Sequence, residues 1–224
     1  MKLFLIFIII FSIIIYLIEL DRNRYSPETF YNYYINDSPK SLIYGFYNSL
    51  FKLINNKYIY DINKFKFYHS FKKKIKKIKK ELIESNYINL SSYAHNDNTK
   101  LNKDNNFKII KIKFFNKFYF EKEFKTIHKL CKKHINIRSC FFSILNSRKI
   151  IPYHVGPYCG LLRCHIPIII NKDHDSHMII NNIKINCSDP FIFDDTYVHK
   201  LEKLDDYLRI VLIIDIDHPN KLFI

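Results

Sequence analysis

Apolar residues recur at every second position through much of the C-terminal half of the chain. Residues 107–115 (FKIIKIKFF) place Ile110, Ile112 and Phe114 between lysines, a pattern that predicts a half-buried β-strand. From position 139 onward, short apolar runs alternate with prolines and polar breaks: CFFSIL, HVGPY, LLRCHIPIII, MIINNIKI, PFIFDDTYVH and YLRIVLIIDI. Closely spaced short strands without intervening helices predict an antiparallel barrel or sandwich.

Helical periodicity precedes these strands. Residues 67–85 carry an apolar stripe at helical spacing (Phe71, Ile75, Ile78, Leu82), and residues 121–134 carry a second one (Phe124, Ile127, Cys131). Residues 86–106 are rich in Asn, Ser and Asp and predict a long loop. Residues 21–66 mix Tyr, Asn and Lys with short apolar groups, so we expect one or two helices there and assign them no chemistry.

The N-terminal stretch has no polar face. Residues 3–18 (LFLIFIIIFSIIIYLI) are broken only by Ser12 and Tyr16, and as a helix they cover about 24 Å of a ~30 Å hydrocarbon core. No cleavage site with small residues follows, so we predict an uncleaved single-pass signal anchor over residues 1–20, with a cleaved signal peptide as the alternative. Positive charge flanks the segment on both sides and does not set its orientation.

The chain is basic, with 36 Lys and Arg against 21 Asp and Glu and a net charge of +15. Seven lysines lie between Lys72 and Lys80, on the predicted amphipathic helix. They read either as a solvated helix face or as a contact with anionic lipid headgroups. Nucleic acid is the less favoured partner, because aromatic residues occur throughout the chain and their interleaving with lysine is not specific. Five cysteines without a CxxC motif exclude a fully paired disulfide scaffold and a zinc ribbon.

Arg209 lies within the apolar run YLRIVLIIDI, where a buried guanidinium needs an anion. Asp205 and Asp215 have the same parity along the strand, but they are roughly 13 and 20 Å away in an extended chain. An acidic residue from elsewhere in the chain would satisfy Arg209, and so would a bound carboxylate or phosphate.

Histidines stand near this arginine in the predicted sheet. His154 precedes a Gly-Pro turn, and His199 ends the run FIFDDTYVH. Each alone reads as a structural residue, but two imidazoles on separate strands with an arginine on the next strand suit a mononuclear Fe(II) site. Such a site leaves coordination positions open for a chelating co-substrate and O2.

These stretches resemble the aspartyl/asparaginyl β-hydroxylase family of 2-oxoglutarate- and Fe(II)-dependent oxygenases. The matching motifs are FSIL (142–145), HVGP (154–157), LRCHIP (162–167), FDDTYVH (193–199) and LRIVLIIDIDHP (208–219), in the family's order. The resemblance implies a mainly β fold with supporting helices, a double-stranded β-helix of the jelly-roll, cupin-like kind. It covers residues 67 to 219, so we divide the chain into an anchor (1–20), a juxtamembrane helical or linker region (21–66) and an oxygenase domain (67–224).

The resemblance also implies roles for individual residues. His154 and His199 match the catalytic iron ligands, and Gly156 stands where most 2-oxoglutarate oxygenases carry a carboxylate ligand, as in some members of this family. Ser143 and Arg209 match the residues that hold the distal carboxylate of 2-oxoglutarate. Arg163 and His165 match those that hold the carboxylate nearer iron. The flanking Cys164 is expected to point away from the pocket, and Asp194 and Asp195 match an acidic pair with a turn or supporting role.

The implied activity is a dioxygenase that uses Fe(II), 2-oxoglutarate and O2 to hydroxylate an unactivated C–H bond. The expected substrate is the β-carbon of Asp or Asn in a peptide or protein. Leu161 replaces an arginine that holds the acidic substrate in the family's peptide hydroxylases, so a lipid acyl chain is the alternative. A second alternative is an inactive, membrane-anchored basic binding module. An anchored catalytic domain on the lumenal side, as in the endoplasmic reticulum, would match animal relatives.

Overall fold

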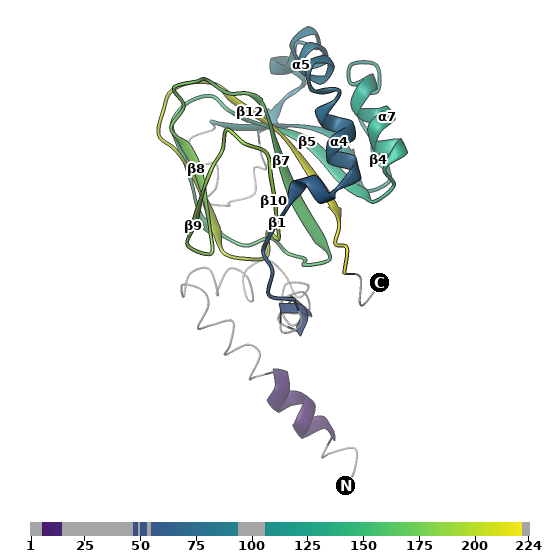
Figure 1. Cartoon of the computed structure of the whole chain (residues 1–224), viewed down its shortest axis with the longest axis vertical. Helices are drawn as coiled ribbons and strands as arrows, with labels where there is room; N and C mark the ends of the chain where they lie inside the picture. The colour runs from purple at the N-terminus through teal and green to yellow at the C-terminus, as the bar shows by residue number, and fades with distance from the viewer. Residues whose placement is uncertain (1–5, 15–46, 49, 53–54, 94–105, 221–224) are drawn as a thin grey trace.

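The computed structural model describes residues 6–14, 47–48, 50–52, 55–93 and 106–220. Two antiparallel sheets form the body of the protein (Figure 1). The larger sheet has the order β1-β10-β7-β12-β5-β3-β2, with β4 paired to β3, and the smaller has the order β6-β11-β8-β9. The strands are β1 (Ile59–Tyr60), β2 (Ser92–Tyr93), β3 (Phe107–Phe114), β4 (Lys117–Phe118), β5 (Ile137–Leu145), β6 (Lys149–His154), β7 (Leu161–Ile169), β8 (Ser176–Ile180), β9 (Ile183–Asn186), β10 (Phe191–Phe193), β11 (His199–Lys203) and β12 (Arg209–Asp217).

The connectivity of β5 to β12 is that of a jelly roll. Successive strands alternate between the two sheets, except for the β8–β9 hairpin, and every neighbouring pair in both sheets is antiparallel. The mainly β fold with antiparallel sheets predicted from the period-two pattern is therefore confirmed. Strand β12 lies at the centre of the larger sheet, between β5 and β7, and all nine of its residues are buried.

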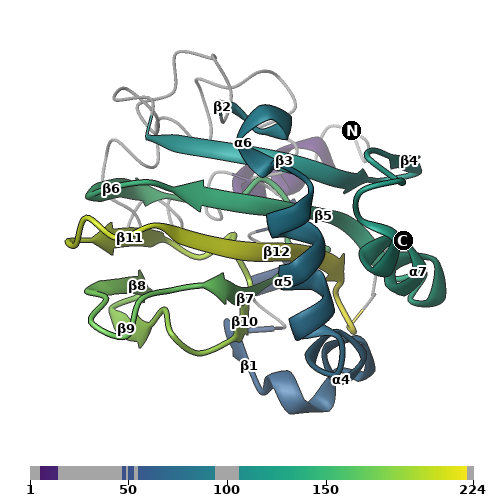
Figure 2. The same cartoon turned by 90° about the horizontal axis from the view of Figure 1, so that it is seen from above.

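Helices cover the outer face of the larger sheet, which explains why β12 is apolar on both faces (Figure 2). They are α4 (Lys66–Lys72), α5 (Ile75–Glu84) and α7 (Lys125–Lys133). Their buried stripes pack against outward-facing residues of the sheet in one cluster, which includes Phe71, Ile78, Phe124, Phe142 and Ile214. A second, smaller cluster fills the interior of the barrel with residues such as Leu145, Met178 and Phe193.

Two helices stand where one was predicted. The apolar stripe of residues 67–85 is present, but the helix is interrupted at Lys73 and Lys74, between α4 and α5. The backbone N–H of Lys74 closes a tight turn onto the carbonyl of Phe71. The break lets both helices pack against α7, where the Glu81 carboxylate of α5 accepts hydrogen bonds from the backbone N–H and hydroxyl of Thr126. An acidic group at the first turn of α7 is also favourable for the helix dipole.

The region between the expected anchor and the domain contributes to the sheet. Its described residues include β1, which pairs with β10, and a 3-10 turn η2 (Ile62–Lys64). No strand was predicted there, because two residues are too short to show a period-two pattern. Likewise, the predicted loop of residues 86–106 contains α6 (Tyr87–Leu90) and β2 where it is described.

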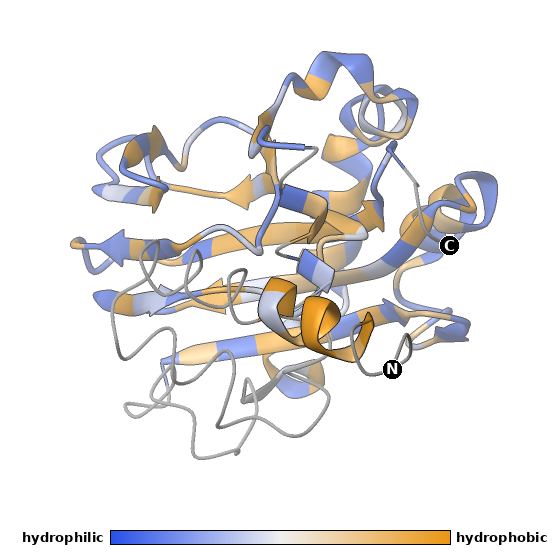
Figure 3. Cartoon of the chain, turned by 90° about the horizontal axis from the view of Figure 1, so that it is seen from below, coloured by the Kyte–Doolittle hydropathy of each residue, from blue (hydrophilic) through white to orange (hydrophobic). Residues whose placement is uncertain are grey.

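The expected anchor over residues 1–20 lies partly outside the described residues. Residues 6–14 form an exposed apolar helix, coloured as hydrophobic in Figure 3. Within the part of the chain that the structure describes, no helix is both long enough and apolar enough to cross a bilayer.

The helical layer should be required for stability. Phe71 is fully buried between α4 and the sheet, so Phe71→Ala should lower the free energy of unfolding by about 3–5 kcal/mol. Ile83→Ala, at an exposed position of α5, is the control and should change it by less than about 0.5 kcal/mol. Urea denaturation followed by circular dichroism measures both, and equal effects would show that α4 does not seal the core.

Candidate active site

The two predicted iron ligands lie side by side on neighbouring strands of the smaller sheet. His154 ends β6, His199 begins β11, and the two residues are direct partners in the antiparallel pairing. Their ring centroids are 4.1 Å apart. The pairing shifts register just after His199, so a local irregularity accompanies this juxtaposition of two imidazoles.

Both imidazoles are held through the same atom, Nδ1, by backbone carbonyls. The Nδ1 atom of His154 lies 2.8 Å from the carbonyl oxygen of Pro152, and the Nδ1 atom of His199 lies 2.8 Å from that of Tyr197. A carbonyl only accepts hydrogen bonds, so each neutral ring carries its proton on Nδ1 and its lone pair on Nε2. This is the arrangement that a histidine metal ligand requires.

The surroundings keep both rings neutral. Burial lowers the pKa of His154 to about 4, the bond to Pro152 opposes this shift, and Arg163 adds to it. Burial, the neighbouring His154 ring and Arg163 hold the pKa of His199 well below its usual value. Neutral imidazoles are the form that can donate an electron pair to a cation, so the pair is suited to a divalent metal.

A carboxylate fills the space beside His154 that a side chain at position 156 would otherwise take. A Cβ atom added to Gly156 would lie 2.3 Å from Cγ of Asp195, and the Gly156 N–H donates to the Asp195 carbonyl at 2.6 Å. Glycine is therefore required here by the close approach of Asp195. No group of three or more His, Cys, Asp or Glu side chains placed to hold a metal occurs among the described residues.

Arg163 lies on the interior face of β7 between two carboxylates. Its Nη1 is 2.8 Å from Asp195 and its Nε is 2.8 Å from Asp215, while Ser139 donates to the second oxygen of Asp215. Burial lowers the pKa of Arg163, but the two carboxylates outweigh it and the net shift is upward. The sequence pattern did not identify this triad. Asp215 could have indicated it, because a carboxylate that faces inward from an apolar strand needs a cation as its partner.

Arg209 and His165 carry buried polar atoms that lack a partner. Among the described residues, the Nε atom of Arg209 and the Nδ1 atom of His165 are two of four such atoms. Arg209 is 3% exposed and its guanidinium hydrogen-bonds the Cys187 thiol. His165 lies against the rings of Phe191 and Phe193, and burial together with Arg209 and Arg163 holds its pKa well below the usual value.

The remaining predicted residues fall on the expected faces. Ser143 of β5 pairs with Val211, and Leu145 two residues later pairs with Arg209, so Ser143 and Arg209 face the barrel interior together. Cys164 packs in the outer cluster with Leu162 and Ile166, as expected. Of the two alternatives for Arg209, the acid from elsewhere in the chain is not among its hydrogen-bonding partners in the described structure. Arg163, in contrast, has two acidic partners.

Two residues that precede the predicted domain, Asn48 and Lys52, bind the loop after His154 and the loop before His199. Asn48 donates to the carbonyl of Pro157 and accepts from the N–H of Cys159, in the loop after His154. Lys52 donates to the carbonyl of Thr196, in the loop before His199. Both side chains are buried. Sequence patterns could not predict these contacts, because polar residues far from a site in the chain carry no local signal.

Asp194 supports the second loop. Its Oδ1 accepts from the N–H and the hydroxyl of Thr196, which matches the turn role expected for this residue. Its Oδ2 is buried and has no partner among the residues that the structure describes. Burial raises the pKa of Asp194 to about 7, against the hydrogen bonds from Thr196 and the charge of Lys52, and Asp195 adds to the rise.

Gly156→Ala should force Asp195 away from its place. The added methyl group would overlap a carboxylate held by Arg163, so we expect a loss of about 1–3 kcal/mol in stability. Thermal and urea unfolding measure the loss. Unchanged stability would mean that Asp195 does not occupy the space beside position 156.

Stability should depend on the ionisation of Asp194. Its pKa is about 3.8 in the unfolded chain and about 7 when folded, so the native state binds the extra proton between these values. The Asp194 contribution therefore destabilises the fold increasingly as the pH rises from about 4 to about 7. Asp194→Asn should gain stability relative to the wild type at pH 8 and lose this advantage near pH 4. Urea denaturation at both pH values tests this, with Asp173→Asn, an exposed loop position, as the control.

The chain shows a likeness to solved structures of hydroxylases. The solved structures to which this chain shows a likeness include a prolyl hydroxylase from Trichoplax adhaerens in complex with a hypoxia inducible factor peptide (TM-score 0.49, 12% identity, 75% of this chain and 87% of that one). Another is a prolyl-4-hydroxylase from Pseudomonas putida (TM-score 0.43, 8% identity, 64% and 86%).

A curated relative is the ornithine lipid ester-linked acyl 2-hydroxylase of Rhizobium tropici, 34% identical over 88 residues. The match covers 38% of this chain and 31% of the relative. The model of the Aspartyl/Asparaginyl beta-hydroxylase family matches residues 72–219, which is more than half of the chain. The protein is therefore a member of the aspartyl/asparaginyl β-hydroxylase family.

Proposed function

We propose that the protein is an Fe(II)- and 2-oxoglutarate-dependent dioxygenase that hydroxylates an unactivated C–H bond. Family membership supports the hydroxylase part of this proposal. The observation that carries the cofactor part is the pair His154 and His199, whose Nδ1 atoms are both engaged by carbonyls and whose Nε2 atoms are left to bind a metal.

The donor set fits iron. Two neutral imidazoles leave several coordination positions for water, a chelating co-substrate and O2, which is what a mononuclear oxygenase centre needs. Gly156 supplies no third protein ligand. The Asp195 carboxylate beside it is bound to Arg163, so water rather than a carboxylate would complete the coordination.

The barrel interior also fits 2-oxoglutarate. The unpartnered Nε of buried Arg209 would receive the distal carboxylate, with Ser143 on the same face beside it. His165 and Arg163 lie on β7, and both act electrostatically on the pKa of His199. Arg163 uses three of its five N–H donors on Asp195 and Asp215, and it keeps two for the carboxylate nearer the metal.

The chain's own contribution to the reaction is orientation and the exclusion of water. Bound iron, together with 2-oxoglutarate and O2, would supply the oxidising power that C–H hydroxylation needs. His154 and His199 would hold the metal through neutral rings, so metal binding would require no proton release from them near neutral pH. Phe191 and Phe193 would wall the co-substrate from solvent and keep its ionic contact with Arg209 strong.

Two substrate classes remain in the proposal. The β-carbon of Asp or Asn in a peptide or protein is supported by the family match. A lipid acyl chain is supported by the relative from Rhizobium tropici and agrees with apolar Leu161 at the start of β7. The N-terminal apolar segment as a membrane anchor, with the catalytic domain lumenal, is proposed on the sequence alone.

Metal and co-substrate binding test the proposal directly. Titration of the purified chain with Mn(II) and 2-oxoglutarate, followed by electron paramagnetic resonance, should show metal uptake that His154→Ala and His199→Ala each weaken at least about 100-fold. Exposed His69→Ala is the matched control and should bind as the wild type does. No uptake by the wild type would favour the inactive binding module instead.

Turnover tests the remaining roles. Succinate should form from 2-oxoglutarate with Fe(II), and Arg209→Ala should raise the KM for 2-oxoglutarate about 10- to 100-fold. Arg148→Ala removes an exposed arginine paired with Asp206 and should leave the KM unchanged. Mass spectrometry of candidate peptides and lipids for the gain of one oxygen would identify the substrate class, and succinate formation that survives His199→Ala would contradict the proposed centre.

A further inference from the structure

Exposed aromatic residues occur on the hairpin of β3 and β4 and directly after it. Phe114 is 52% exposed, Phe115 is 53%, Tyr119 is 36% and Phe120 is 37%. Ile135, in the turn between α7 and β5, is 84% exposed. It lies at the same edge, because Phe115 donates its N–H to the carbonyl of Arg138. We call these five residues the aromatic tip.

The aromatic tip is held firmly from behind. The N–H of Tyr119 donates to Ile112, and Nε2 of His128 on α7 donates to the carbonyl of Tyr119 at 2.9 Å. Phe118, between the exposed rings, packs instead on the His128 ring. Phe115 and Phe120 have φ angles of 50° and 55°, a left-handed backbone that bulky residues rarely adopt. The backbone that carries the exposed rings is therefore fixed by hydrogen bonds, and the rings are exposed because of this fixed conformation.

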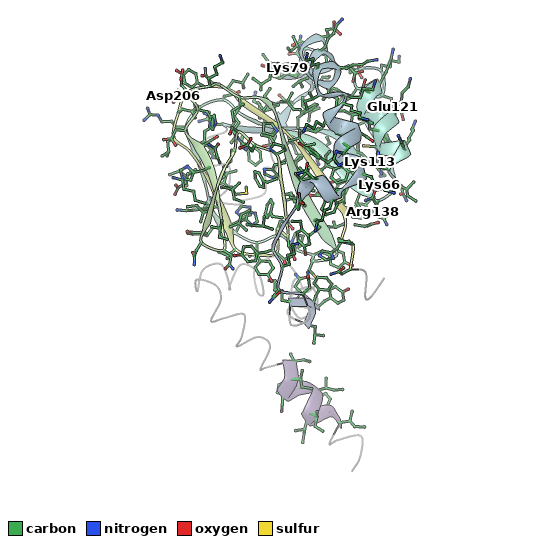
Figure 4. All side chains as sticks on the ribbon, in the orientation of Figure 1. Lys66, Lys79, Lys113, Glu121, Arg138 and Asp206 are labelled. Atoms are coloured by element: carbon green, nitrogen blue, oxygen red, sulfur yellow. The ribbon has the colours of Figure 1, made fainter. Side chains whose placement is uncertain are left out.

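Lysines surround the aromatic tip. Lys117 and Lys122 are exposed on the hairpin and the segment that follows it, and exposed lysines line the adjacent helix α7 (Lys125, Lys129, Lys132, Lys133). Only two glutamates lie in the same stretch, Glu121 and Glu123, and Glu121 is paired with Lys132. Figure 4 labels Glu121 on this side of the molecule, beside α7. The lysine run of residues 72–80 continues the basic surface on α4 and α5, next to α7.

We propose that the aromatic tip and the lysines of α7 form a peripheral binding surface for an anionic lipid bilayer. Isolated exposed apolar residues are ordinary, but five of them on one hairpin and the turn beside it, with the Phe114 and Phe115 rings in contact, mark an interaction site. Aromatic rings favour the headgroup layer of a membrane, and lysines around them are attracted to anionic lipids. Duplex nucleic acid would match the charge but offers no apolar layer for the rings, so the bilayer accounts for both features.

The absence of tryptophan from the sequence allows a position-specific test. Phe114→Trp places the only tryptophan of the variant in the aromatic tip, and Tyr207→Trp places it at an exposed position before β12 as the matched control. Each full-length variant is titrated with vesicles of phosphatidylcholine and phosphatidylserine containing brominated acyl chains. The N-terminal apolar segment is identical in both variants, so it cannot produce a difference between them.

We expect a blue shift and quenching by the brominated lipid for Phe114→Trp and neither for Tyr207→Trp. Equal quenching of both reporters, or of neither, would overturn the proposal. Quenching of Phe114→Trp that is equally strong with phosphatidylcholine alone would overturn the role of charge. A response of Phe114→Trp to single- or double-stranded DNA without a response to vesicles would assign the surface to nucleic acid instead.

Charge reversal tests the lysines separately. In the Phe114→Trp chain, Lys129→Glu with Lys132→Glu should weaken partitioning to anionic vesicles at least about tenfold, since one lysine near the surface contributes roughly fivefold. Lys172→Glu with Lys184→Glu makes the same change in net charge at exposed positions before β8 and on β9. This control pair should change partitioning less than about twofold, and equal losses would show that only the total charge matters.

Discussion

The ion pairs of Arg163 tie together the parts of the barrel that the site depends on. The guanidinium stands on β7, Asp215 stands on β12 beside it, and Asp195 comes from the loop that leads into β11. Asp195 in turn contacts Gly156 after β6, so one partly buried cation links the loops beside both histidines to the central strands. Breaking such a pair leaves an uncompensated buried charge, which costs about 3–5 kcal/mol. The position of the two imidazoles therefore rests on this electrostatic cluster.

Much of the fold could be predicted because burial imposes simple periods. The alternation in residues 107–115 and the apolar runs after position 139 correspond to β3 and to strands from β5 onward. The stripe of Phe71, Ile78 and Leu82 is buried as predicted. The break at Lys73 and Lys74 was not predictable, because the stripe continues across it and neither residue disfavours a helix. It exists because α4 and α5 both pack on α7, a tertiary requirement with no local signal.

Within the site, the sequence pattern could identify which residues take part. It could not identify which other residues they contact. The run YLRIVLIIDI made Arg209 conspicuous, and within the described part of the chain its Nε has no partner. Arg163 differs, because two acids far along the chain bind it. Pairs such as Asn48 with Pro157 join residues more than a hundred positions apart, and only the folded chain brings them together.

The strand β1 has a consequence for the boundary of the folding unit. The family match begins at residue 72, yet β1 covers the outer edge of β10 at the end of the larger sheet. A chain cut just before the matched region would bare the backbone N–H and C=O groups of β10 to other molecules. Unpaired strand edges of this kind recruit further strands and lead to aggregation. The two residues of β1 thus protect the edge of β10 from self-association, although they precede the region that the family model matches.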